Sequence, residues 1–192
     1  MRVWYTTMRA IQLSSLMPAS SPADLVARAR TGDPDALTAL YATFGDSLMA
    51  LAFRLTASRA DAEDVLHDVF LGLPEALRRY EERGSLESWL KRITARVALS
   101  RLRARTRQGE IDLPDDLPLG EPSAPDRLAD FVAVREAIET LPHSLRTVVV
   151  LRELEGYSHS EIAELLGIST NASEVRLHRA IRALRSLLGV KP

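Results

Sequence analysis

Residues 141–188 read LPHSLRTVVVLRELEGYSHSEIAELLGISTNASEVRLHRAIRALRSLL, and the second half of this stretch decides the fold. Ser158 and Glu161 have the spacing of a capping box, in which each side chain accepts a hydrogen bond from the other residue's backbone N–H. The apolar residues that follow predict a short helix, and Gly167 supplies the turn before a longer one. A helix, a tight glycine turn and a second helix form the helix-turn-helix pattern.

The longer helix after Gly167 has one apolar and one basic face. At about 100° per residue, the isoleucine and leucines between residues 177 and 188 cluster within about 60°. The opposite face carries arginines among short side chains, which suits contacts to phosphates and guanine edges. A solvated face on an ordinary helix is the alternative, but the capped turn in front favours DNA. The predicted DNA contacts are Thr170, Asn171, Ala172, Val175, Arg176, Arg179 and Arg182.

A second basic feature lies between Lys91 and Arg107, a segment with seven basic residues and no acidic one. Four arginines project within about 60° of one another, away from the apolar stripe that contains Trp89. Such a strip suits a nucleic-acid backbone, although a solvated helix tail has the same pattern. Tyr80 precedes the helix and is a weaker candidate for stacking on an unpaired base, whereas Trp89 is expected to pack in the core. The arginine ridge consists of Arg92, Arg96, Arg103 and Arg107.

A third feature is the acidic helix flank DAEDVLHDVF at residues 61–70. Asp64, His67 and Asp68 lie on its outer side. No metal site is expected, because the other three histidines lie far away in sequence and no ligand pair recurs. The sequence also offers no phosphate loop and no nucleophile motif, so no catalytic residue or cofactor is predicted. The flank serves either helix-dipole and solubility chemistry or protein docking.

The whole chain predicts an all-α protein made of two small helical domains. Helical periodicity begins at Asp33, which is followed by proline in the first turn, and continues from Ser58, where Pro74 is expected to end or kink the helix. Residues 109–130 carry seven acidic groups and one basic group, and prolines interrupt all periodicity there. The expected divisions are a disordered leader (1–21), a first helical domain (22–107), a flexible acidic, proline-rich linker (108–127) and a helix-turn-helix domain (128–192).

Composition narrows the function further. The 192 residues include no cysteine, which excludes a disulfide scaffold, a thiolate zinc site and a cysteine nucleophile. We expect no membrane insertion, because no run of about 18 apolar residues occurs. A chain without disulfides is compatible with the cytoplasm, which is the predicted location.

Taken together, these segments resemble one family. DAEDVLHDVF, followed by the Trp89 helix and the arginine ridge, resembles the promoter-melting domain of bacterial RNA polymerase sigma factors. Residues 141–188 resemble the helix-turn-helix domain with which these factors bind the upstream promoter element. The presence of these two domains alone is similar to the small extracytoplasmic-function (ECF) subgroup.

The resemblance implies a dissociable initiation subunit rather than an enzyme. Asp64, His67 and Asp68 would dock on core RNA polymerase, and Tyr80 with the arginine ridge would bind the start-proximal element and its opened strand. The helix at 170–182 would enter the major groove of duplex promoter DNA. The resemblance leaves room for an anti-sigma factor as a further partner, although no residue identifies one.

One departure from the family pattern concerns Glu174, an acidic residue at the start of the recognition helix. It predicts weaker nonspecific DNA binding or recognition of a cytosine amino group, so a relative's promoter sequence does not transfer. Two alternatives remain open. A stand-alone helix-turn-helix regulator would bind duplex operators without polymerase, and an interaction protein would keep docking but lose DNA recognition.

Overall fold

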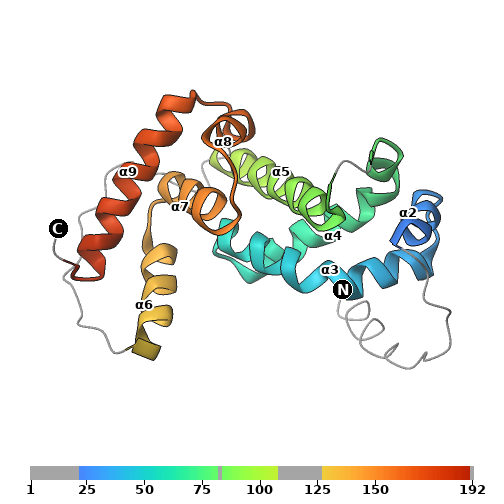
Figure 1. The fold of residues 1–192 in the computed structure, drawn as a ribbon, viewed down its shortest axis with the longest axis horizontal. Coiled ribbons are helices and arrows are strands. Elements are labelled where there is room, and N and C mark those ends of the chain that lie inside the picture. Colours follow the sequence, from blue (N-terminus) through green and yellow to red (C-terminus); the bar gives the residue numbers. More distant parts are fainter. Residues whose placement is uncertain (1–21, 82–83, 108–126, 191–192) are drawn as a thin grey trace.

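The computed structural model describes residues 22–81, 84–107 and 127–190, and within these ranges every regular element is a helix (Figure 1). The all-α prediction is therefore confirmed for the described part of the chain. The expected leader and nearly all of the expected linker lie outside it. The helices are α2 (Pro22–Arg30), α3 (Pro34–Thr56), α4 (Arg59–Arg78), α5 (Leu86–Arg107), α6 (Arg127–Thr140), α7 (His143–Val149), the π-helix η1 (Val150–Leu154), α8 (His159–Leu166) and α9 (Thr170–Leu187).

Local capping fixes the starts of α3 and α4. The Asp33 carboxylate accepts hydrogen bonds from the N–H groups of Asp35 and Ala36, at 2.9 and 3.3 Å, and Pro34 follows it directly. The Ser58 hydroxyl accepts a hydrogen bond from the Asp61 N–H. Both starts agree with the sequence prediction, because a cap satisfies N–H groups that have no partner inside the helix.

The helix α2 was not predicted from the sequence. It is short, and Val26 and Ala29 are its buried contributions to the core. Arg30 donates hydrogen bonds to the carbonyls of Leu77 and Tyr80, both at 2.9 Å, and so ties α2 to the end of α4. These contacts span about fifty residues and leave no local sequence signal.

The helix α3 forms the centre of the first bundle. Leu48, Leu51 and Leu55 are fully buried, and the helix packs against both α4 and α5. By length and hydropathy α3 could also cross a membrane, in contrast to the sequence expectation that no such segment exists. Its buried leucines and its two helical neighbours identify it as a core helix.

The helix α4 continues through Pro74 to Arg78, so of the two expected outcomes, an end or a kink at this proline, the structure rules out the end. Leu73 and Leu77 on either side of Pro74 are fully buried in the core that α2, α3, α4 and α5 share. Their burial stabilises the last turn, which offsets the backbone hydrogen bond that proline cannot donate.

The helices α6, α7 and α9 pack around a second apolar cluster, which includes Leu141, Leu145, Val149 and Ala180. The α8–α9 pair is the predicted helix-turn-helix. Its capping box is complete: Ser158 N–H donates to the Glu161 carboxylate at 2.9 Å, and Glu161 N–H donates to the Ser158 hydroxyl at 3.2 Å.

Two further local features build the turn between α8 and α9. Gly167 has a φ of 68°, a left-handed conformation that glycine adopts without strain. The Ser169 hydroxyl accepts a hydrogen bond from the Ala172 N–H and so begins α9. Sequence signals therefore predict this unit correctly down to its caps.

His143, at the start of α7, makes the stability of the fold depend on pH. Burial, reinforced by the nearby Arg146 charge, lowers the pKa of His143 from 6.5 to about 4. Its Nδ1 bonds with the Thr147 hydroxyl at 3.1 Å, and its Nε2 is buried without a partner among the described residues. The folded state therefore retains the neutral imidazole.

Between pH 6.5 and about 4 the unfolded chain binds a proton at His143 that the folded chain does not bind. The free energy of unfolding should consequently fall by up to about 3 kcal/mol as the pH drops through this window. Urea denaturation at several pH values, comparing the original chain with His143→Gln, measures this contribution. Identical pH slopes in the two proteins would contradict it.

The two groups of helices also pack against each other. One continuous apolar cluster contains Leu51 and Leu55 from α3 together with Val148 from α7, Leu151 from η1 and Ile162 from α8. Figure 1 shows α7 beside α3 and α8 beside α5. The helix-turn-helix is thereby placed against the helix that carries the arginine ridge.

Candidate nucleic-acid interface

The outer face of α9 is open to solvent. Thr170, Asn171, Val175, Arg179 and Arg182 are all exposed, as the sequence predicts for a surface that binds DNA. Val175 keeps 49% of its surface accessible although it is apolar. An exposed apolar side chain among amide and guanidinium groups is suited to contact a thymine methyl group.

Two of the predicted contact residues, Ala172 and Arg176, are half-buried at the flank of this face. The reason is that the buried side of α9 is rotated slightly relative to the apolar stripe that the sequence predicts. Its buried side begins at Ser173, whose hydroxyl bonds with His159 Nδ1 of α8 at 2.9 Å. The sequence analysis missed this contact because serine does not contribute to an apolar pattern.

The rotation also exposes residues that the sequence analysis did not include. Glu174, His178 and Arg185 all face solvent on α9. The exposed Glu174 lies one helical turn before His178, so its negative charge is available to an approaching nucleic acid. Helical periodicity could have identified His178 and Arg185 had Ser173 been recognised as an inward-facing residue.

The arginine ridge on α5 lies against α8. Arg92 Nη2 is 3.1 Å from the Glu161 carboxylate, and Arg96 Nη2 is 3.4 Å from that of Glu164. Arg103 Nη1 donates to the Leu165 carbonyl at 3.4 Å. The side chains of Arg92 and Arg96 are still 61% and 67% accessible, so these arginines stay at the surface.

Arg107, the fourth residue of the ridge, ends α5, and its side chain lies outside the described residues. Within the described part of the ridge, the arginines therefore project on one side of α5, as predicted. The sequence did not predict that carboxylates of the helix-turn-helix would meet them there.

Tyr80 is a core residue in this structure. It is only 8% accessible, its ring centroid lies 4.7 Å from that of Trp89, and its hydroxyl is 3.5 Å from the Gly84 carbonyl. A base contact would require this ring to leave the core, so the burial argues against the suggested stacking role. Trp89 packs against the same core, as expected.

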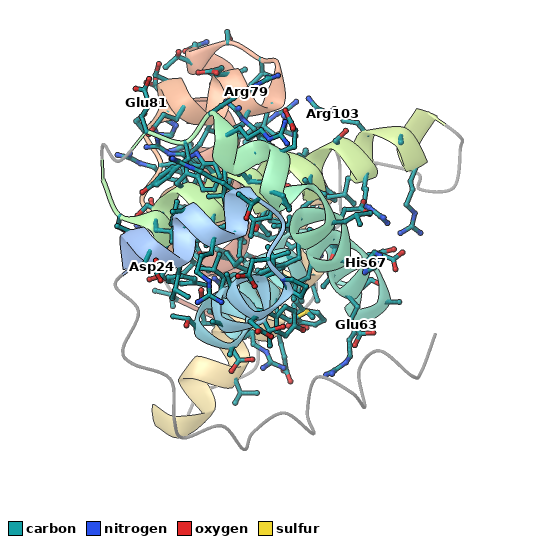
Figure 2. The ribbon with its side chains drawn as sticks, turned by 90° about the vertical axis from the view of Figure 1, so that its right-hand side faces the viewer. Asp24, Glu63, His67, Arg79, Glu81 and Arg103 are labelled. Atoms are coloured by element: carbon teal, nitrogen blue, oxygen red, sulfur yellow. The ribbon has the colours of Figure 1, made fainter. Side chains whose placement is uncertain are left out.

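The acidic flank of α4 forms a separate surface. Asp64 and His67 are exposed, and Figure 2 shows His67 and Glu63 projecting from α4, apart from Arg103. Arg101 of α5 pairs with two of the four acids of the flank, at 3.1 Å from Asp64 and 2.6 Å from Asp68. The pairing fixes the two carboxylates on the side of α4 that meets α5.

Leu71 extends this surface by one helical turn beyond His67, and 73% of it is accessible. The sequence analysis did not single it out, because a leucine in an apolar helix is normally assigned to the core. An exposed leucine beside these side chains adds apolar area that a docking partner could bury. We call Asp64, His67, Asp68 and Leu71 the acidic docking face, after the role that the family resemblance implies for its first three residues.

The fold and these surfaces define an all-α protein with a helix-turn-helix, an exposed polar and basic face on α9, a basic ridge on α5 and an acidic face on α4. Two family models match the chain: "Sigma-70 region 2" at residues 40–108 and "Sigma-70, region 4" at residues 131–184. The chain belongs to the ECF group of RNA polymerase sigma factors. It is a transcription initiation factor of a soluble, non-enzymatic class.

Similar proteins cover most of the chain. It is 31% identical over 180 residues to the ECF RNA polymerase sigma factor SigE of Mycolicibacterium smegmatis, covering 89% of this chain and 70% of the relative. It is 32% identical over 164 residues to the RNA polymerase sigma factor CarQ of Myxococcus xanthus, covering 84% and 94%.

Solved structures show the same fold. Compared with this chain, CnrH in the structure of its complex with the cytosolic domain of CnrY has a TM-score of 0.52 and 28% sequence identity. The comparison covers 88% of this chain and 97% of the CnrH chain. The sigma factor RpoE of Bartonella quintana, in complex with the anti-sigma factor NepR, has a TM-score of 0.56 and 22% identity, covering 79% and 96%. At that identity the likeness to RpoE concerns the fold alone.

Proposed function

We propose that this chain binds core RNA polymerase, directs it to a particular set of promoters and helps to open the DNA there. The observation that carries the proposal is that both family matches, to region 2 and to region 4, fall on helices that present an exposed basic surface. The polymerase supplies the chemistry of RNA synthesis, and this chain supplies recognition.

Each surface has a separate role in the proposal. The outer face of α9, with Asn171, Val175, Arg179 and Arg182 at its centre, enters the major groove of the upstream element. The arginine ridge holds the backbone of the start-proximal element and of its opened strand. The acidic docking face binds the core enzyme.

The division of the chain into modules at 22–107 and 128–192 is part of the proposal. Each module alone presents only a small DNA-binding surface. Two weak contacts on one tether gain affinity when a third body holds both at the correct span, because the second contact then forms at a high effective concentration. Core polymerase is that body.

Run-off transcription on fragmented genomic DNA tests the proposal. Core polymerase with the purified chain is expected to produce transcripts with discrete start sites that core polymerase alone does not produce. Binding to duplex sites with full affinity in the absence of polymerase, and no new transcripts in its presence, would favour a stand-alone regulator instead. The family matches favour the sigma factor.

Two further expectations belong to this function. Transcription takes place in the cytoplasm, so we place the chain there. The structure of CnrH was determined in complex with the cytosolic domain of CnrY, and that of RpoE in complex with the anti-sigma factor NepR. An anti-sigma factor is therefore a reasonable partner to seek for this chain.

A further inference from the structure

Glu174 is the one acidic residue in the sequence of α9, and no charge pairing explains it. The residue is exposed, and its carboxylate has no hydrogen bond or ion pair among the residues that the structure describes. The positions three and four residues away on either side hold no lysine or arginine. By contrast, both acids of α8 are paired, Glu161 with Arg92 and Glu164 with Arg96.

The helix dipole does not account for Glu174 either. The helix α9 begins at Thr170, so Glu174 is its fifth residue, and the first turn holds no acidic side chain. The attraction between a carboxylate and a helix N-terminus falls off within that first turn. The Glu174 side chain therefore contributes little to the fold and is available for a contact outside the chain.

The direction in which Glu174 projects is set by the residue before it. Ser173 is fully buried, and its hydroxyl bonds with His159 Nδ1 of α8 at 2.9 Å. Successive residues of a helix differ by about 100° in direction. With Ser173 held inward, Glu174 shares the exposed side of α9 with Asn171, Val175 and His178, and these four residues span only about 100°.

This part of α9 is the part that reads bases in helix-turn-helix proteins. The recognition helix lies in the major groove, and its N-terminal residues contact the base edges. Glu174 lies between Asn171 and Val175, which the proposed function places in that groove. It is about 4.5 Å beyond Asn171 along the helix axis, and base pairs are stacked about 3.4 Å apart. A helix that brings Asn171 to one base pair therefore brings Glu174 to a neighbouring pair.

A carboxylate discriminates sharply among the four bases in the major groove. It only accepts hydrogen bonds. Guanine and thymine present acceptors there, and adenine presents an acceptor, N7, beside its amino group, whereas cytosine presents the N4 amino donor. The phosphates on both sides of the groove also repel a negative charge. A site without cytosine near Glu174 therefore leaves its charge uncompensated.

We propose that Glu174 determines promoter specificity by accepting a hydrogen bond from the N4 amino group of one cytosine in the upstream element. The inference rests on the proposed function, because it requires α9 to enter the major groove. The competing explanation is that Glu174 only weakens all DNA binding by repelling phosphates. That explanation predicts no preference for any base, so the two are separated by base identity rather than by affinity.

Selection from a promoter library tests the proposal. A promoter mapped by run-off transcription is synthesised with a randomised upstream element and incubated with core polymerase and the full chain. The templates retained in heparin-resistant complexes are then sequenced. The original chain is expected to enrich cytosine at one position about tenfold over the other bases. That position should be next to the one whose preference is lost in Asn171→Ala.

Glu174→Gln is the decisive variant, because glutamine has the same length and pairs with N6 and N7 of adenine. It should replace the cytosine preference by adenine at that position and leave the other preferences unchanged. The unchanged preferences also show that the variant folds and binds DNA. The matched control is Glu153→Gln, which makes the same charge change at an exposed residue of η1 and should keep the cytosine.

Two defined templates that differ only at that base pair give the quantitative measurement. Run-off transcription by the original chain should favour the cytosine template about tenfold, and Glu174→Gln should abolish or reverse this ratio. The same ratio for both proteins, or an equal gain on both templates, would overturn the proposal. Failure of the proposed function gives a different result, since the original chain would then enrich no sequence at any position.

Discussion

Replacing Arg179 and Arg182 together with glutamate is expected to lower chain-dependent transcription about a hundredfold or more. Both side chains are exposed on the outer face of α9. Loss of each arginine contact to a base or phosphate costs about 1–3 kcal/mol, and the introduced negative charges repel the backbone in addition. The measurement is run-off transcription with core polymerase on a promoter that the original chain recognises.

The matched control for this pair is Arg185→Glu. It makes the same kind of charge change on the same helix, but in the last turn of α9, away from the N-terminal part that reads bases in helix-turn-helix proteins. Its effect should be much smaller. Arg176 is unsuitable for the test because it is half-buried, so its substitution would also disturb packing. Equal losses for Arg185→Glu and for the double variant would show that net charge matters rather than the assigned face.

Leu71→Asp is expected to weaken binding to core polymerase about 10- to 100-fold. Leu71 is 73% accessible in the free chain, so an aspartate there costs the fold little. If the residue becomes buried on docking, the lost transfer free energy is about 1.5–3 kcal/mol, and a carboxylate must also be desolvated. Titration of labelled chain with core polymerase measures the change.

Leu154→Asp serves as the control for docking, because Leu154 is an exposed leucine on η1, outside the docking face. It should bind core polymerase like the original chain. Charge reversal of Asp64 and Asp68 is a less direct test, since both pair with Arg101 and their loss also affects the contact between α4 and α5. Unchanged binding of Leu71→Asp would place the docking site elsewhere.

The features that the sequence predicts well are those with local causes. The caps at Asp33, Ser58 and Ser158 act within three residues, and the turn at Gly167 depends on its own φ. Each leaves a short, recognisable pattern. The same holds for most of the outer face of α9, because helical periodicity separates Val175, Arg179 and Arg182 from the buried side, although it placed the half-buried Arg176 on the outer face.

The features that the sequence does not predict depend on tertiary contacts. Pro74 remains within α4 because its neighbours are buried, and Tyr80 is covered by packing against Trp89. The ion pairs between α5 and α8 join residues nearly seventy positions apart. A pairing of that kind leaves no periodicity, so these contacts of the arginine ridge only become evident in three dimensions.

The central claim is that this chain enables core polymerase to recognise and open promoter DNA. Permanganate footprinting at a start site mapped by run-off transcription tests the claim most directly, because it detects unpaired thymines. With core polymerase and the chain together, we expect reactive thymines next to the start site, and none with either protein alone. Unchanged duplex reactivity with both proteins bound would contradict the account.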